Sequence, residues 1–169
     1  YYAMGLIDQI ILQGEDSRLH QSLVKKNGFT GNVNGGINLL GNMFNYNGPM
    51  LWMASLFYDS STKQADIITA VDAEMEKLSK TPVNQATLDR AIIKLRSNYY
   101  DNVGGFFGIG RADLLCSFAL FDDNPERINN LEAEFRKVTP ELIRKTAAEY
   151  LRKSNRTILT INPTKKAQP

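Results

Sequence analysis

The sequence has 169 residues and a mass of 19.0 kDa, which fits one domain with its own hydrophobic core. Its 20 basic and 18 acidic residues leave a net charge of +2, so the chain lacks the basic footprint of nucleic-acid-binding proteins. The longest apolar run, residues 50–58, is shorter than the roughly 20 residues that cross a bilayer. We therefore expect neither a nucleic-acid partner nor a membrane span.

The first third of the chain predicts a helix and a hairpin. Residues 3–26 have the spacing of an amphipathic helix, with Gly14 as the point where we expect a kink or a break. The apolar positions of this helix are Leu6, Ile10, Leu19 and Leu23. Residues 29–38 alternate loosely and predict a strand, and residues 39–49 predict a loop rich in Asn and Gly. Residues 50–58 predict a second strand, buried on much of both faces, that pairs with the first.

Capping signals then predict a series of helices. Residues 61–64 have capping-box spacing, so a helix should begin at Thr62, and Asn84 can cap the next one. The apolar stripes of these two helices are Ile67, Val71, Met75 and Leu78, and then Leu88, Ile92, Leu95 and Tyr99. Gly104-Gly105 ends the second helix, and residues 106–121 predict a further apolar helix.

The last part of the chain repeats one helix-start pattern and then alternates. Asn124-Pro125 and Thr139-Pro140 each place a capping side chain before a proline at the first helical position. The apolar positions after these starts are Ile128, Leu131, Phe135 and Val138, and then Leu142, Thr146 and Tyr150. Residues 157–161 alternate as a closing strand, and residues 163–169 form a polar tail.

Together these elements predict an α+β fold in which an antiparallel sheet is backed by helices on one face. We assign residues 1–162 to one domain, because no linker, repeat or low-complexity segment interrupts them. Three strands are few for so many helices, and the apolar pattern is already running at Tyr1. We therefore expect one or more further strands to precede residue 1.

The potential ligands and nucleophiles argue against a catalytic or metal centre in this chain. His20 is the only histidine and Cys116 the only cysteine, whereas a zinc hydrolase needs three protein ligands, usually with imidazole or thiolate among them. We interpret His20 as a solvated or partly packed side chain, and Cys116 as a buried, small apolar residue. A catalytic triad built on His20 is disfavoured, because no serine lies in a Gly-x-Ser-x-Gly elbow.

Glycine-rich segments leave two interpretations open. Residues 31–36 and 41–48 are rich in Gly and Asn, which allows close approach of the backbone. They form either an edge hairpin that meets a peptide or another domain by strand addition, or a mobile loop. Gly108-Ile109-Gly110 starts like a dinucleotide fingerprint but lacks the third glycine, so we interpret it as a helix break. Asp122-Asp123 is interpreted as the end of a helix.

Several segments, in their order and spacing, resemble one known family. Residues 6–14 (LIDQIILQG) lead into residues 23–31 (LVKKNGFTG), which are similar to a family segment patterned Leu-Arg-x-x-x-Gly-Leu-x-Tyr. Residues 88–95 resemble a later helix of the family and residues 139–151 its final helix. The family is that of the pitrilysin/insulinase zinc metallopeptidases, and the resemblance is to its carboxy-terminal half.

The resemblance implies a fold like one half of a mitochondrial processing peptidase, and a non-catalytic role. In family peptidases zinc lies in the amino-terminal half, in a His-x-x-Glu-His motif with a downstream Glu, and the second half faces it across a chamber. This chain would thus hold no catalytic, cofactor-binding or metal-binding residue, with zinc in an upstream catalytic half of the same polypeptide. Its partners would be that half, a peptide substrate and a second family half-pair.

One departure from the family pattern concerns Val24 and Gly31. Many family members place an Arg and a Tyr at these positions, where they contact the peptide near the zinc. Neither Val24 nor Gly31 can donate a side-chain hydrogen bond to a carbonyl oxyanion. The resemblance therefore implies a substrate-chamber and scaffold half that is inactive alone. The alternatives are a proteolytically inactive structural or assembly subunit of the same fold, and an unrelated binding module.

Overall fold

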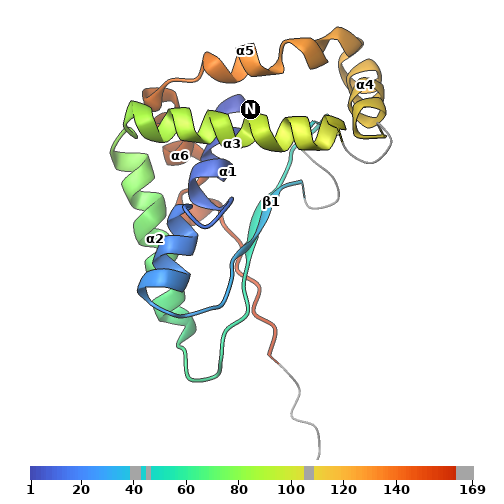
Figure 1. The fold of residues 1–169 in the computed structure, drawn as a ribbon. Coiled ribbons are helices and arrows are strands. Elements are labelled where there is room, and N and C mark those ends of the chain that lie inside the picture. The colour runs from blue at the N-terminus through green and yellow to red at the C-terminus, as the bar shows by residue number, and fades with distance from the viewer. Residues whose placement is uncertain (39–42, 45–46, 105–108, 163–169) are drawn as a thin grey trace, which may run out of the picture.

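The computed structural model describes residues 1–38, 43–44, 47–104 and 109–162. It is mostly helical, with one small antiparallel sheet (Figure 1). The elements in chain order are α1 (Tyr2–Ile11), a π-helix (His20–Lys26), β1 (Asn34–Ile37), β2 (Trp52–Ser55), α2 (Gln64–Lys80), α3 (Gln85–Gly104), α4 (Ile109–Asp122), a 3-10 helix (Pro125–Asn129), α5 (Leu131–Arg136), α6 (Pro140–Tyr150) and a 3-10 turn (Lys153–Asn155). None of the described helices is both long and apolar enough to span a membrane.

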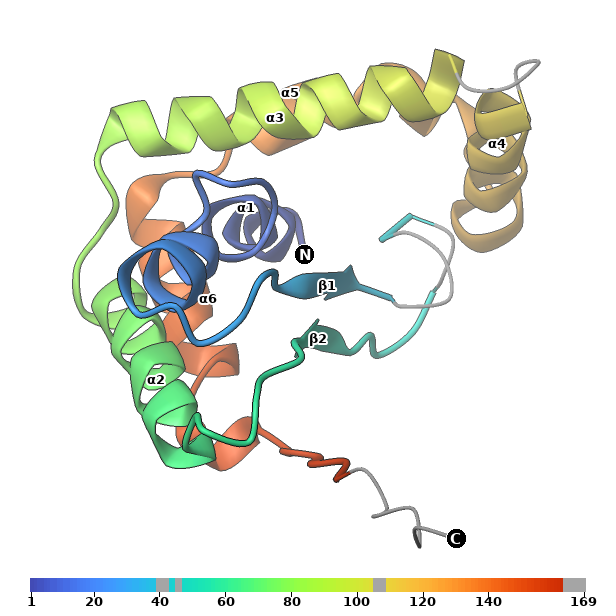
Figure 2. The same ribbon diagram turned by 60° about the horizontal axis from the view of Figure 1, so that its bottom comes forward.

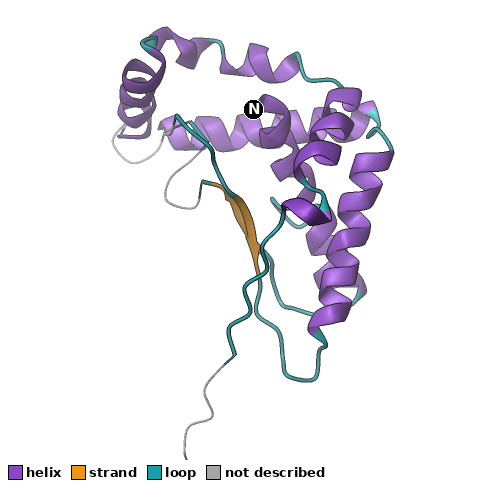
Figure 3. Ribbon diagram, turned by 180° about the vertical axis from the view of Figure 1, so that it is seen from behind, coloured by secondary structure: helices purple, strands orange, loops and turns teal. Residues whose placement is uncertain are grey.

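Helix α1 is the centre around which the other elements pack. It contacts α3 on one side and α6 on another, while α2 packs along α6 (Figure 2). Its residues Leu6, Ile7 and Ile11 are fully buried, and they join Phe135 of α5 in the main hydrophobic core. In a smaller hydrophobic cluster, Leu114 and Phe118 of α4 pack with Leu131 of α5. The hairpin lies beside α1, at the edge of the helical layer, as the view from behind shows (Figure 3).

Three of the predicted helix boundaries are confirmed. The first helix breaks near Gly14, which has a φ of +80°, a conformation that glycine adopts without steric cost. Asn84 caps α3, since the Thr87 N–H donates to Asn84 Oδ1 at 2.8 Å. Thr139 caps α6 in the same way, with the Leu142 N–H donating to Thr139 Oγ1 at 3.2 Å. These boundaries depend on local side-chain chemistry, which can be predicted from the sequence.

Other helix predictions are wrong in detail. Helix α2 begins at Gln64, two residues after the predicted start at Thr62, and its cap position is Lys63, which makes no side-chain capping hydrogen bond. Asn124 precedes a 3-10 helix, and the α-helix α5 starts only at Leu131. The predicted apolar stripe of the last helix lies on the wrong face: Leu142 is 44% exposed and Tyr150 53% exposed. The buried side chains of α6 are instead Ile143 and Ala147, because α6 turns that face towards α1 and α2.

The strands are shorter and more exposed than predicted. The hairpin itself is confirmed: β1 pairs antiparallel with β2, with Gly35 opposite Ala54. Yet β2 has four residues, and Leu51 and Phe57 beside it are 73% and 92% exposed, so this run is not buried on both faces. Residues 157–161 form no strand with any described residue. The predicted α+β fold is thereby corrected to a mostly helical domain with a two-stranded sheet.

The interpretation of Cys116 as a buried residue is also wrong. Cys116 is exposed on α4, because the helix turns Leu114 and Phe118 inward and so presents Cys116 to solvent. Some predictions fall on residues 39–42, 45–46, 105–108 and 163–169, which lie outside the described part of the chain. They include much of the predicted loop 39–49, Gly105 at the predicted helix end, and the polar tail.

Candidate functional site: a polar groove beside the first strand

A polar groove of about 480 Å³ runs between the loop after α1 and the segment that leads into β1. Its walls are residues 12–15, His20 and residues 31–35. Gly31 and Gly35 of the second wall carry no side chain, and Asn32, Val33 and Asn34 stand between them. A crevice of about 10 Å³ between α3 and α5 has room for no more than one water. Of these two cavities, the groove is the one with room for part of a ligand.

A buried carboxylate, Asp8, joins α1 to the hairpin beside this groove. Asp8 is 7% exposed, and its Oδ1 accepts from Trp52 Nε1 of β2 at 2.7 Å, while its Oδ2 accepts from Gln13 Nε2 at 3.0 Å. Burial raises the pKa of Asp8, and the hydrogen bonds from Trp52 and Gln13, together with the charge of Lys94, partly offset this effect. The carboxylate thus connects β2 to α1 and to Gln13, which lines the groove.

Lys94 of α3 fixes the other end of the same loop. Its Nζ donates to the main-chain carbonyls of Gln9 and Gln13 and to Asp16 Oδ1, each at 2.8 Å. A cation at the C-terminus of a helix satisfies its last carbonyls and interacts favourably with the helix dipole. Lys94 is therefore a cap for α1 supplied by another helix, and it rigidifies the loop that lines the groove.

Gly35 is required for the close pairing of the two strands. It has a φ of +147°, and a Cβ atom there would lie 2.0 Å from the carbonyl oxygen of Met53. No side chain can occupy that position without moving the backbone. Gly31, on the same wall, is different: nothing lies within 4 Å of the place where its Cβ would be. The groove is consequently open at Gly31 and closely packed at Gly35.

The structure places the two positions of the family's Arg and Tyr in different surroundings. Val24 is half-buried on the π-helix and packs against the main core, whereas Gly31 lines the groove and is exposed. His20 also lines the groove; its Nε2, like Ser17 Oγ, is buried and has no hydrogen-bond partner among the described residues. Unpaired buried polar atoms of this kind are uncommon in folded proteins. The interpretation of His20 as partly packed agrees with its intermediate exposure.

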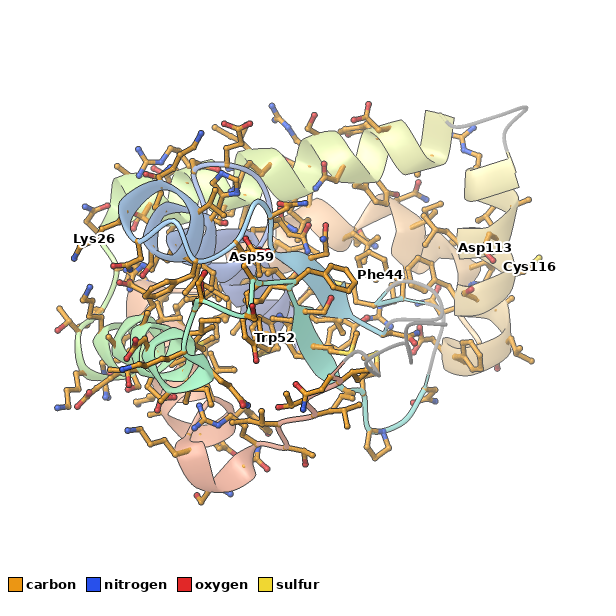
Figure 4. The ribbon with its side chains drawn as sticks, turned by 90° about the horizontal axis from the view of Figure 1, so that it is seen from below. Lys26, Phe44, Trp52, Asp59, Asp113 and Cys116 are labelled. Carbon is orange, nitrogen blue, oxygen red and sulfur yellow. The ribbon has the colours of Figure 1, made fainter. Side chains whose placement is uncertain are left out.

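The donor atoms of this chain do not fit a zinc site. His20 lies in the π-helix that ends at Lys26, and Cys116 lies on α4 at the far side of the molecule (Figure 4). Among the described residues no three His, Cys, Asp or Glu side chains come together as a metal site would require. Asp122 ends α4 and pairs with Arg127, which agrees with the interpretation of Asp122-Asp123 as a helix end.

Sequence reasoning missed the polar network of Asp8, Gln13, Trp52 and Lys94. One signal was present: Asp8 stands in the apolar run of residues 6–12, on a helix whose neighbours are buried. A charged residue in such a run has to find donors. Its partners Trp52 and Lys94 lie 44 and 86 positions further along the chain. Only the folded structure shows that they meet Asp8.

Residues 1–95 match the family model described as the peptidase M16 inactive domain. The chain belongs to this family. The M16 peptidases are the insulinase family, so the resemblance read from the sequence is confirmed. The family is zinc-dependent, and its inactive domains are typically paired with a catalytic half. No curated protein sequence matches the chain.

Solved structures show the same fold at low sequence identity. The inactive peptidase domain of a candidate zinc protease from Bordetella parapertussis is 20% identical with a TM-score of 0.76, covering 99% of this chain and 86% of that one. A protease from Helicobacter pylori is 18% identical with a TM-score of 0.73, covering 91% of this chain and 35% of that one. A peptidase M16 inactive domain from Pseudomonas fluorescens is 21% identical with a TM-score of 0.67, covering 87% and 32%. The chain thus spans about a third of the Helicobacter protein.

Proposed function

We propose that this M16 inactive domain is the substrate-chamber and scaffold half of a zinc-dependent metalloendopeptidase that acts on peptides or small proteins. Zinc is then held by an amino-terminal catalytic half of the same polypeptide. The observation that carries the proposal is the match of residues 1–95 to the inactive domain of these peptidases. The groove beside β1 supplies the place where the domain would meet the peptide.

The shape of the groove supports an extended peptide as its ligand. The groove wall includes Gly31 and Gly35, which carry no side chain, and β1 is an edge strand of a two-stranded sheet. Extended peptides bind such edges through main-chain hydrogen bonds, with specificity supplied by the side chains around them. On this account the groove recognises the backbone of an unfolded segment, which suits a peptidase that accepts varied sequences.

We further propose that strands preceding residue 1 complete the sheet on its β2 side, as in one half of a mitochondrial processing peptidase, which leaves the outer edge of β1 open (Figure 2). Residues 157–161 support this proposal, because Leu159 and Ile161 are 82% and 84% exposed in an extended segment. Apolar side chains at such exposure gain stability when another strand covers them. Residues 1–162 would then form one domain, with residues 163–169 as its tail.

The chemistry near the zinc would come from elsewhere. Attack on a peptide carbonyl produces an oxyanion, and one preorganised donor to it lowers the barrier by roughly 2.7–4 kcal/mol in a known case. Val24 and Gly31 carry no such donor, and Val24 packs against the core. We therefore propose that an Arg and a Tyr come from a second half-pair, fused to this polypeptide or separate from it.

Steady-state kinetics of the intact polypeptide test this proposal. Gly31→Trp places a large ring in the groove without backbone strain, and Ala65→Trp on the exposed side of α2 is the matched control. We expect Gly31→Trp to lower kcat/KM for an unstructured peptide about tenfold, with Ala65→Trp unchanged. Equal activity of both variants would contradict a role for the groove. An intact protein that lacks the upstream His-x-x-Glu-His motif and cleaves nothing would instead identify a structural or assembly subunit.

A further inference from the structure

On the outer edge of β1, the direction of the Gly35 carbonyl is fixed by the pairing of the strands. The Asn38 N–H donates to the Leu51 carbonyl at 3.2 Å, and Asn38 follows β1 directly. In an antiparallel pair, hydrogen-bonded and non-hydrogen-bonded positions alternate along the strand. Gly35, three positions before Asn38, therefore directs its carbonyl away from β2 and towards the groove.

That carbonyl is already occupied by a side chain of the same molecule. Gln13 Nε2 donates to the Gly35 oxygen at 3.2 Å, and the second hydrogen of the same amide goes to Asp8 Oδ2 at 3.0 Å. The main-chain carbonyl of Gln13 is held by Lys94 Nζ. The side-chain amide of Gln13 is therefore held by Asp8 and Gly35, and its main chain by Lys94, at the place where the N–H of an added strand would lie.

We propose that Gln13 is an edge guard, whose side-chain amide stands in for the next strand and has to leave when an extended peptide pairs with β1. Exposed strand edges are templates for unwanted pairing, and natural proteins block them with side chains or bulges. The ligand class is an extended main chain, which offers its own N–H to the Gly35 carbonyl in exchange. The peptide part of this inference rests on the proposed function, whereas the protection of the edge does not.

Gln13 lowers the affinity of the edge for any peptide that pairs with β1. A peptide that displaces Gln13 gains one hydrogen bond and breaks another, so the Gly35 carbonyl contributes little to affinity while Gln13 is present. Removing the amide makes that bond a net gain, which corresponds to a change in Kd of about two- to tenfold. Gln13 thereby favours peptides that make further contacts along the groove over any chain that merely offers a strand.

Two variants of Gln13 and one matched control test this inference in the intact polypeptide. Gln13→Met keeps the length of the side chain without its donor, and Gln13→Ala removes the side chain. Gln21→Met is the control, because the Gln21 amide donates to the Glu15 carbonyl at 2.7 Å, in the loop after α1 and not on the hairpin. Binding of a labelled unstructured peptide is followed by fluorescence anisotropy in the presence of chelator, and self-association by sedimentation velocity.

We expect both Gln13 variants to bind the peptide about two- to tenfold more tightly than the parent protein, and to self-associate at lower concentration through the opened edge. Gln21→Met should match the parent in both measurements. Unchanged self-association and unchanged or weaker peptide binding in both Gln13 variants, with native circular dichroism, would overturn the inference. If no form of the protein binds the peptide, the proposed function fails, and self-association alone decides whether Gln13 guards the edge.

Discussion

Replacing Trp52 by Phe isolates the indole N–H that joins β2 to the buried carboxylate of Asp8. The bond measures 2.7 Å from Trp52 Nε1 to Asp8 Oδ1, and Asp8 is 7% exposed. A hydrogen bond to a charged buried group is worth about 1.5–3 kcal/mol. We therefore expect Trp52→Phe to lower the free energy of unfolding by about that amount at neutral pH, plus a smaller loss from the reduced ring.

The pH dependence of this loss separates the hydrogen bond from the packing. Burial raises the pKa of Asp8, and the bond from Trp52 lowers it, so the variant has the higher pKa in the folded state. A raised folded pKa means that stability is present below the unfolded pKa and is lost as the pH rises through the folded pKa. The penalty of Trp52→Phe should consequently be full at pH 8 and should shrink as acid protonates Asp8.

Urea denaturation followed by far-UV circular dichroism measures the effect. Fluorescence is unsuitable, because Trp52 is the only tryptophan. The same substitution in an Asp8→Asn background should cost less by about 1 kcal/mol, since the acceptor is then neutral. A loss that does not shrink as the pH falls from 8 into the acid range where the fold persists, and that is the same in both backgrounds, would refute the reasoning about Asp8.

Three further predictions concern the core, the groove wall and the metal. Phe135→Ala should lower the free energy of unfolding by about 3–5 kcal/mol, because Phe135 is fully buried and its ring centroid lies 5.0 Å from that of Tyr2. A loss below about 1.5 kcal/mol in urea denaturation would contradict this expectation. Gly31→Tyr should change stability by less than about 0.5 kcal/mol, whereas Gly35→Ala should cost at least about 1 kcal/mol; the reverse order of urea midpoints would show that the groove wall is wrongly described. Residues 1–169 should bind no stoichiometric zinc after dialysis, and one tightly held zinc per chain that is lost on His20→Ala would show otherwise.

The parts of the fold that could be predicted from the sequence are those with local causes. The caps at Asn84 and Thr139 and the break at Gly14 each depend on one residue and its immediate neighbours. The strand lengths could not be predicted, because an apolar run such as residues 50–58 predicts burial only if other elements cover it. The sequence pattern predicts that Leu51 and Phe57 are buried, whereas both side chains are exposed in the structure.

The candidate site was harder to predict for a related reason. Gly31 was identified as a position of interest through the family resemblance, and the structure does place it at the groove. Gln13 lies in residues 6–14, which resemble a family helix, but the sequence assigns it no role. Its partners Asp8 and Gly35 come together only when α1 packs against the hairpin. Hydrogen bonds from a side chain of one element to the main chain of another do not produce a periodic pattern in the sequence. They can be identified only in the folded structure.

Cleavage of an unstructured peptide, by the intact polypeptide and by residues 1–169 alone, tests the central proposal most directly. Each is assayed with and without a zinc chelator. If this domain is the non-catalytic half of a zinc peptidase, the intact protein cleaves the peptide, the chelator stops it, and residues 1–169 cleave nothing under either condition. Chelator-sensitive cleavage by residues 1–169 alone would contradict the proposal, since the catalytic centre would then lie within this chain.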